Sequence, residues 1–401
     1  MQGVRLPHLR ALQVQVVFMV FIVIVMIPMY ETFMYRADEG SRQHHVECGT
    51  LARLKPTNQF LPGQPNPALS LVLIVRYFEV KIENKVHWTF SRLLRLGVRN
   101  PEVAAEVAKL MDHREELEGE GQLANMWRCT AVAPLVHHLP ESPFTEQDVL
   151  HAIGLLQTNT VSIGVPGHSQ GLGLFPTFSL LSHSCTANAR YQVLPDRGMV
   201  LRAQVDILKG EEVTIHYMTP MLGTAARRSK IRKNWFFDCT CARCRDPTEM
   251  GTFASALLCP DCTKAGNEGV LLPADPLNPA CPLTCSVPDC ESQEEAARVN
   301  AMVAKFEVDL ETEGESVEAL ETFLVTLGQT LHPQHYLMMT GKRRLLASLH
   351  LATSQGGGGA PSRLLLQQIV DLADESLRVF GVLDPGPTVL KGRMLQYRFR
   401  Y

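Results

Sequence analysis

Nine of the eleven cysteines of this chain lie between Cys185 and Cys290, and their spacing constrains the fold more than any other feature. The segment DCTCARC places Cys239, Cys241 and Cys244 in a C-x-C-x2-C pattern. Three thiolates so close together can converge on one metal ion, but tetrahedral zinc needs a fourth ligand. Cys185, in the otherwise apolar run FSLLSHSCTANARYQV, is the natural candidate. The sequence therefore predicts a four-cysteine zinc site that joins two distant segments.

A second group of cysteines follows directly. CPDC supplies Cys259 and Cys262, which have the spacing of half a zinc knuckle. Two of the next three cysteines complete the site; Cys285 and Cys290 are favoured, and Cys281 remains a competitor. Sites made only of thiolates leave no open coordination position, so both zinc ions are expected to be structural.

Composition narrows the classes of partner. The formal net charge of -3 and the sequence pI of about 6.5 give no overall electrostatic reason for direct nucleic-acid binding. The basic run RRSKIRK, residues 227–233, is interpreted as the solvated face of a helix, with peptide or nucleic-acid contact as the alternative. Cysteines at metal-ligand spacing favour a reducing compartment, which means the nucleus, the cytoplasm or both.

The segment from Ala11 to Tyr30 has the composition of a membrane-spanning helix. It contains no charged residue over roughly the length that spans a bilayer, and Arg5 and Arg10 precede it. A membrane helix through residues 11–30 would place the thiolates in an oxidising space, which conflicts with the zinc prediction. The alternatives are a core strand and a stretch absent from the mature protein.

Three short strands and a helix are expected in the middle of the chain. ARYQVLP, MVLRAQVDI and EEVTIHYM have strand patterns, with LKGE as a tight turn. TAARRSKIRKNW is expected to be helical. Before them, TEQDVLHAIGLLQ predicts a helix with Thr145 as its N-cap. PTNQFLPGQPNPAL, within residues 49–70, and SQGGGGAPS, residues 354–362, are expected to be loops.

Taken together, GLGLFPTFSLLSHSCTAN, ILKGEEVTIHY and RRSKIRKNWFFDCTCARC resemble the SET and post-SET segments of the SET/MYND family of protein lysine methyltransferases. The resemblance covers roughly residues 68–401, and the arthropod-type members look most similar. HHVECGTL, with His44 and Cys48, looks like the last His and Cys of a MYND finger. The earlier part of that finger and the family's N-terminal strands are expected to be replaced by the hydrophobic segment.

The resemblance implies an α+β fold with a β-rich SET core. The expected parts are a hydrophobic segment with the MYND-finger remnant, a helical insert, the SET core, a cysteine-rich zinc-binding post-SET segment and a helical, TPR-like C-terminal domain, at residues 1–48, 68–157, 158–238, 239–291 and 292–401.

The resemblance also implies roles for single residues. Tyr217 would be the active-site tyrosine, and Asn159, Ser182, His183, Tyr217 and Phe237 would contact S-adenosylmethionine. Cys185 would join the DCTCARC cysteines on zinc, as the ligand count already indicates. Asn188 would help to lock the knot-like crossing of two segments that characterises the fold.

Three positions depart from the family pattern. Ser182 replaces an Asn, which costs a hydrogen bond to the cofactor worth about 1 kcal/mol. Ala187 replaces a Pro. Trp235 stands where a second active-site Tyr is usual, and its indole can form a wall of the lysine channel but offers only a donor.

The implied function is transfer of a methyl group from S-adenosylmethionine to a protein or peptide lysine. The alternative is a catalytically inactive, zinc-stabilised scaffold that has kept the SET fold. A monomer is expected in either case.

Overall fold

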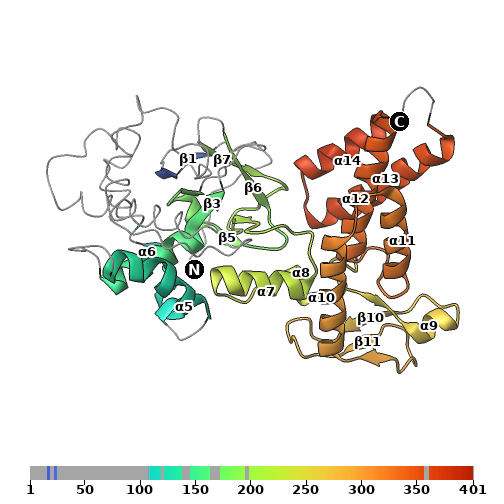
Figure 1. Ribbon diagram of the computed structural model, residues 1–401, viewed down its shortest axis with the longest axis horizontal. Coiled ribbons are helices and arrows are strands. Elements are labelled where there is room, and N and C mark those ends of the chain that lie inside the picture. Colours follow the sequence, from blue (N-terminus) through green and yellow to red (C-terminus); the bar gives the residue numbers. More distant parts are fainter. Residues whose placement is uncertain are drawn as a thin grey trace.

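The computed structural model describes residues 16–18, 22–24, 107, 109–118, 122–137, 145–162, 172–194, 198–355 and 361–400. Within these residues the chain is an α+β protein, with short strands up to residue 294 and long helices in its C-terminal region (Figure 1). The expected α+β class is confirmed. The predictions for residues 49–70, His44 and Cys48 lie outside the described residues.

Three small sheets build the strand-rich part. An antiparallel sheet has the order β1 (Val16–Phe18), β7 (Met199–Ala203), β6 (Ala189–Val193), and a second has the order β2 (Ile22–Ile24), β4 (Leu172–Leu174), β3 (Thr160–Ser162). The third pairs β5 (Ser182–His183) with β8 (Thr214–Ile215) in parallel. The strands predicted at ARYQVLP, MVLRAQVDI and EEVTIHYM are therefore present.

The structure revises the sequence-based interpretation of the hydrophobic segment at residues 11–30, which was expected to replace the N-terminal strands, with a membrane helix as one alternative. Its two described pieces are strands: Val17 pairs with Val200 of β7, and Val23 pairs with Gly173 of β4. The segment thus supplies strands to the core instead of replacing them. Among the described residues, no helix has the length and apolar character that a membrane crossing requires. Of the alternatives that the sequence left open, the two described pieces support the core strand. Hydropathy alone could not decide, because Val and Ile favour strands as readily as buried helices.

A helical insert covers one end of the core. It contains α4 (Arg114–Glu118), α5 (Gln122–Trp127), a π-helix (η2, Arg128–His137) and α6 (Glu146–Asn159). Thr145 caps α6 as predicted, because its hydroxyl accepts from the Asp148 N–H at 3.2 Å. Gly154 lets α6 approach the chain closely: a Cβ there would lie 1.7 Å from the Asp112 carbonyl oxygen.

The zinc-ligand region links the two halves of the molecule. The short 3-10 helix η3 (Phe178–Leu180) leads into β5, and the predicted basic helix is α7 (Thr224–Trp235). The cysteine-rich segment contains, in order, α8 (Ala242–Arg245), β9 (Leu257–Leu258), α9 (Pro260–Lys264), β10 (Val270–Pro273), β11 (Leu283–Cys285) and β12 (Gln293–Glu294).

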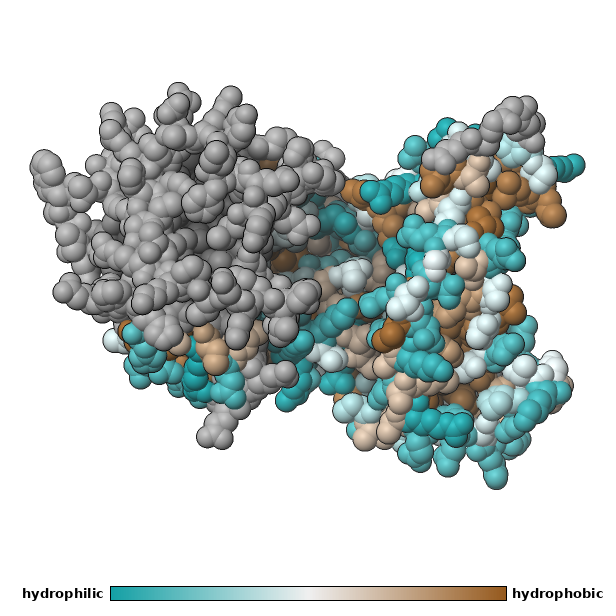
Figure 2. Space-filling model, viewed as in Figure 1, coloured by the Kyte–Doolittle hydropathy of each residue, from teal (hydrophilic) through white to brown (hydrophobic). Residues whose placement is uncertain are grey.

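Five helices complete the chain: α10 (Ala296–Thr312), α11 (Val317–Gly328), α12 (Tyr336–Gln355), α13 (Arg363–Leu383) and α14 (Val389–Arg400). Leu346, Ile369 and Phe380 are almost fully buried between them. The outer surface of these helices is mostly polar, with separate apolar patches (Figure 2). Each helix therefore buries one face, as its amphipathic sequence predicts.

An ion pair ties the C-terminal helices to the SET core. The guanidinium of Arg190, in β6, donates to the carboxylate of Asp384, at the end of α13. The Nε2 atom of His216 lies 3.7 Å from the same carboxylate. His216 directly precedes Tyr217, so the C-terminal region packs close to the predicted active-site tyrosine.

Candidate functional site

The site is built where β5 and β8 run side by side. Ser182 lies opposite Thr214 and His183 opposite Ile215, and the Ser184 N–H donates to the Ile215 carbonyl at 3.2 Å. Cys185 and Tyr217 each follow their strand by two residues. The parallel pairing therefore brings together two residues that the sequence separates by 32 positions.

Asn188 fastens these two segments to each other. Its side chain is buried, its Nδ2 donates to the Glu212 carbonyl at 2.9 Å, and its Oδ1 accepts from the Thr214 N–H at 2.9 Å. The NH2 group and the carbonyl oxygen of the Asn188 amide thus both bond to the backbone of residues 212–214. The cross-link that the sequence predicted for Asn188 is present.

Replacing Asn188 by Ala should destabilise the SET core. The change removes the part-buried bonds to the Glu212 carbonyl and the Thr214 N–H, and each lost hydrogen bond costs about 0.5–1.5 kcal/mol. Urea unfolding followed by circular dichroism measures the effect. Gln192→Ala, an exposed position in β6, is the control and should change the unfolding free energy by less than about 0.5 kcal/mol.

His183 connects the predicted active-site tyrosine to the first cysteine group. Its Nδ1 accepts from the Tyr217 N–H at 3.1 Å, and its Nε2 lies 3.3 Å from the Cys185 Sγ. Since Nδ1 is the acceptor, the ring proton lies on Nε2 and points at the sulfur. Burial, with a further contribution from His216, lowers the pKa of His183 to about 4, so the ring is neutral at neutral pH.

Tyr217 is held at both its backbone and its hydroxyl. The hydroxyl donates to the Leu181 carbonyl at 2.6 Å. Burial, together with the nearby Glu212 carboxylate, raises the pKa of Tyr217 to about 12. The hydroxyl therefore keeps its proton near neutral pH, and its oxygen lone pairs remain available as acceptors.

Aromatic rings surround the tyrosine. The Tyr217 ring centroid lies 5.3 Å from that of His183 and 5.3 Å from that of Trp235. Phe237 meets the Tyr217 ring edge-on at 6.4 Å and lies 6.2 Å from His183. The structure thus brings together three of the predicted cofactor residues, His183, Tyr217 and Phe237. Ser182 precedes His183 in β5, and its contact with the cofactor stays a prediction.

Asn159 is placed differently from the other predicted cofactor residues. It lies at the C-terminal end of α6, where its Nδ2 donates to the Met111 carbonyl at 2.9 Å and the Leu155 carbonyl at 2.8 Å. The Asn159 carbonyl accepts from the Ser179 hydroxyl at 3.0 Å. These bonds make Asn159 an anchor of the helical insert, and a contact with the cofactor stays a prediction.

The first cysteine group has the predicted members. The sulfurs of Cys185, Cys239, Cys241 and Cys244 all lie within 4.8 Å of one another. The Cys185 Sγ lies 3.9 Å from the Cys239 Sγ and 3.6 Å from the Cys244 Sγ. Four converging sulfurs from two distant segments fit one tetrahedral zinc ion.

The second group resolves the choice that spacing left open. The sulfurs of Cys259, Cys262, Cys285 and Cys290 lie within 4.8 Å of one another. Cys281 is outside this group: its sulfur accepts from the Asp275 N–H at 3.4 Å and donates to the Pro282 carbonyl at 3.5 Å. The set of four also fits a structural zinc ion, because it contains only thiols and no other ligand type.

The basic run RRSKIRK, predicted as the solvated face of a helix, is exposed at most positions but not at Arg227. Arg227 is fully buried, and its Nε donates to the Cys185 Sγ at 3.2 Å. Arg232 and Lys233 are exposed, as predicted. The sequence interpretation also missed Arg243 and Glu249, which are buried with Arg227. The signal available in the sequence was position: Arg227 lies one helical turn before Ile231, on the buried face of α7.

Comparisons with known proteins bear on this site. Residues 53–218 match the model of the SET domain. SET domain-containing protein SmydA-8, isoform A, from Drosophila melanogaster is 37% identical over 238 residues, which are 58% of this chain and 46% of that protein. Histone-lysine N-methyltransferase SMYD3 from Mus musculus is 27% identical over 209 residues, which are 50% of this chain and 43% of that protein.

The chain therefore spans less than half the length of these two curated relatives. A solved structure, that of the SET domain of LSMT bound to lysine and AdoHcy, overlaps 89% of this chain and 80% of the other at a TM-score of 0.28 and 14% sequence identity. A likeness of that level supports no further conclusion.

Proposed function

We propose that this chain, which resembles SMYD-type SET-domain proteins, transfers methyl groups from S-adenosylmethionine to lysine side chains of proteins. The observation that carries the proposal is the arrangement of Tyr217. Its backbone is held by His183, its hydroxyl is held by Leu181, and aromatic rings surround it.

S-adenosylmethionine supplies a methyl group on a sulfonium, so the reaction is an in-line displacement by the lysine amine. The protein has to align the amine, exclude water and favour its neutral form. Desolvation by apolar walls lowers the pKa of an amine. Trp235 and Phe237, which both pack against the Tyr217 ring, are suited to this task.

The Tyr217 hydroxyl has a second task in the proposed reaction. Its proton is used in the bond to the Leu181 carbonyl, so its oxygen can accept weak C–H···O contacts from a polarised methyl group. We assign binding of the methyl donor to Ser182, His183, Tyr217 and Phe237, with Asn159 as the remaining predicted contact.

The other assignments rest on the same premise. The two cysteine groups hold structural zinc, and the partner is a protein or peptide lysine. The division into insert, SET core, post-SET segment and C-terminal helical domain at residues 68–157, 158–238, 239–291 and 292–401 is kept as part of the proposal. The nucleus and the cytoplasm are the proposed compartments, and a monomer is the proposed state.

The experiment for this function is a methyl-transfer assay on the zinc-loaded full chain. The protein is incubated with tritium-labelled S-adenosylmethionine and either core histones or an array of lysine-containing peptides, and the products are hydrolysed to amino acids. Label in N-methyl-lysine is the expected result. Label in other residues alone, or none on any lysine, would contradict the proposal.

A further inference from the structure

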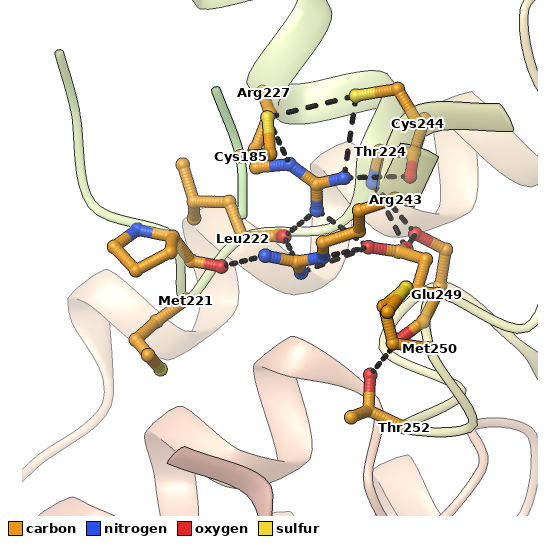
Figure 3. A network of polar contacts seen from close by, with 12 residues as sticks. Cys185, Met221, Leu222, Thr224, Arg227, Arg243, Cys244, Glu249, Met250 and Thr252 are labelled. Atoms are coloured by element: carbon orange, nitrogen blue, oxygen red, sulfur yellow. Dashed lines mark hydrogen bonds and ion pairs between the residues drawn. The ribbon is translucent and has the colours of Figure 1, made fainter. Parts of the chain in front are cut away.

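A buried network of charges adjoins the first cysteine group. Arg227 and Arg243 are both fully buried, and Glu249 is 1% exposed (Figure 3). One carboxylate oxygen, Oε2 of Glu249, accepts from Arg227 Nη1 at 2.5 Å and lies 2.9 Å from Arg243 Nη2. Two guanidiniums thus share one carboxylate, which leaves this network with a net positive charge.

Arg227 directs two of its nitrogens to the cysteine sulfurs, while its Nη1 also donates to the Leu222 carbonyl. Its Nε donates to the Cys185 Sγ at 3.2 Å and its Nη2 lies 3.6 Å from the Cys244 Sγ. The same Nη2 also donates to the Thr224 hydroxyl at 2.9 Å. Arg243 instead donates to oxygen atoms: the Glu249 carboxylate and the carbonyls of Pro220 and Leu222.

The charge of the first zinc site explains why the Arg227 cation is buried beside it. Four thiolates around one divalent zinc ion carry a net negative charge, and a net charge buried without a partner is costly. Glu249 alone would add to that negative charge. Burial by itself would raise the pKa of Glu249, but Arg227 and Arg243 hold its pKa below the usual value, so it stays ionised. The positive charge of Arg243 offsets the negative charge of Glu249. The positive charge of Arg227 is then left to balance the thiolates.

The second cysteine group has a different environment. Backbone groups donate to its sulfurs: the Cys262 N–H lies 3.5 Å from the Cys259 Sγ, and the Val287 N–H lies 3.4 Å from the Cys285 Sγ. Two of its four cysteines, Cys285 and Cys290, are partly buried, whereas in the first group only Cys241 is. Among the described residues, the two groups therefore differ mainly in the charge that lies beside them.

We infer that Arg227 is a positioning residue of the first zinc site: it supplies the counter-charge and hydrogen bonds for the Cys185 and Cys244 thiolates and makes this site the slower of the two to lose its metal. The zinc assignment comes from the proposed function, but the role of Arg227 goes beyond it. Because Cys185 also accepts from His183, which holds the Tyr217 N–H, Arg227 stands at the end of a chain of contacts that reaches the active-site tyrosine.

The test follows zinc release from the full chain into a chromogenic chelator. The parent protein should release its zinc in two phases, and the fast phase is assigned to the second site by its disappearance in Cys290→Ser. In Arg227→Met the slow phase should become about 10- to 100-fold faster, the usual effect of removing a group that supports a metal ligand, while the fast phase stays unchanged.

Arg243→Met is the matched control, because Arg243 is equally buried and bonds to the same carboxylate but donates to oxygen rather than sulfur. It should speed the slow phase less than Arg227→Met does, because Arg227 keeps its bonds to the Cys185 and Cys244 sulfurs. If Arg227→Met does not yield folded protein, Arg227→Lys serves instead: it keeps the charge but loses the planar guanidinium fork that donates to both sulfurs, and an intermediate release rate is expected.

A spectroscopic measurement separates a positioning role from simple packing. In cobalt-substituted protein, hydrogen bonds to sulfur tune the thiolate-to-metal charge-transfer bands. Loss of the Arg227 donors should shift these bands to lower energy in Arg227→Met or Arg227→Lys. An unchanged slow phase together with unchanged bands would overturn the inference. Neither measurement depends on methyl transfer, so an inactive chain would leave this test intact.

Discussion

Replacing Tyr217 by Phe is expected to lower methyl transfer by about 100-fold or more, the scale seen when a group that stabilises or orients the reacting atoms is removed. The substitution takes away one oxygen and keeps the ring. The lost oxygen both donates to the Leu181 carbonyl and is the acceptor facing the methyl group in the proposed reaction. The rate is measured by transfer of labelled methyl to lysine.

Tyr191→Phe is the matched control for this change. Tyr191 lies in β6 of the same core, and its ring packs edge-on against Phe178 with centroids 4.8 Å apart. Removing its hydroxyl should leave the methyl-transfer rate nearly unchanged. Equal rates for Tyr217→Phe and the parent protein, with two zinc ions still bound per chain, would show that the active-site tyrosine has been wrongly assigned.

Replacing Cys185 by Ser is expected to remove one zinc ion from each chain and to disrupt the site as a whole. Binding of structural zinc by four-ligand sites is worth about 10–16 kcal/mol in small zinc domains, so losing a ligand costs a large part of the folding energy of the post-SET segment. The sulfur also joins β5 to that segment and accepts from His183 and Arg227. Elemental analysis measures the zinc, and thermal unfolding measures the stability.

Cys281→Ser is the control for the cysteine assignments. Its sulfur lies outside both groups of four, so two zinc ions per chain and the parent unfolding temperature are expected. Loss of zinc in Cys281→Ser, or two zinc ions retained in Cys185→Ser, would contradict these two ligand sets.

The sequence alone predicted all four ligands of the first zinc site but left a choice among the ligands of the second. The spacing of Cys239, Cys241 and Cys244 admits little besides a common metal, and the missing fourth ligand pointed to Cys185. Spacing could not decide among Cys281, Cys285 and Cys290, because the pairing of β10 with β11 determines which sulfurs reach the CPDC half-site. That pairing depends on tertiary structure.

Two other features, the strands within residues 11–30 and the burial of Arg227, could not be predicted from the sequence alone. The run around Val17 and Val23 is uniformly apolar, and a pattern without period cannot separate a buried strand from a helix. Arg227 lies in a basic run where charge suggested solvent, whereas its side chain meets thiolates and a carboxylate that come from elsewhere in the sequence. The Asn188 cross-link was predictable only because the resemblance implied the crossing of two segments.

The most direct test of the central claim is a calorimetric titration of S-adenosylmethionine into the zinc-loaded full chain. Micromolar binding at one site per chain is the predicted result, weakened when Phe237 or His183 is replaced. No binding, in protein shown to be folded and to carry two zinc ions, would contradict the claim that this chain is a methyltransferase.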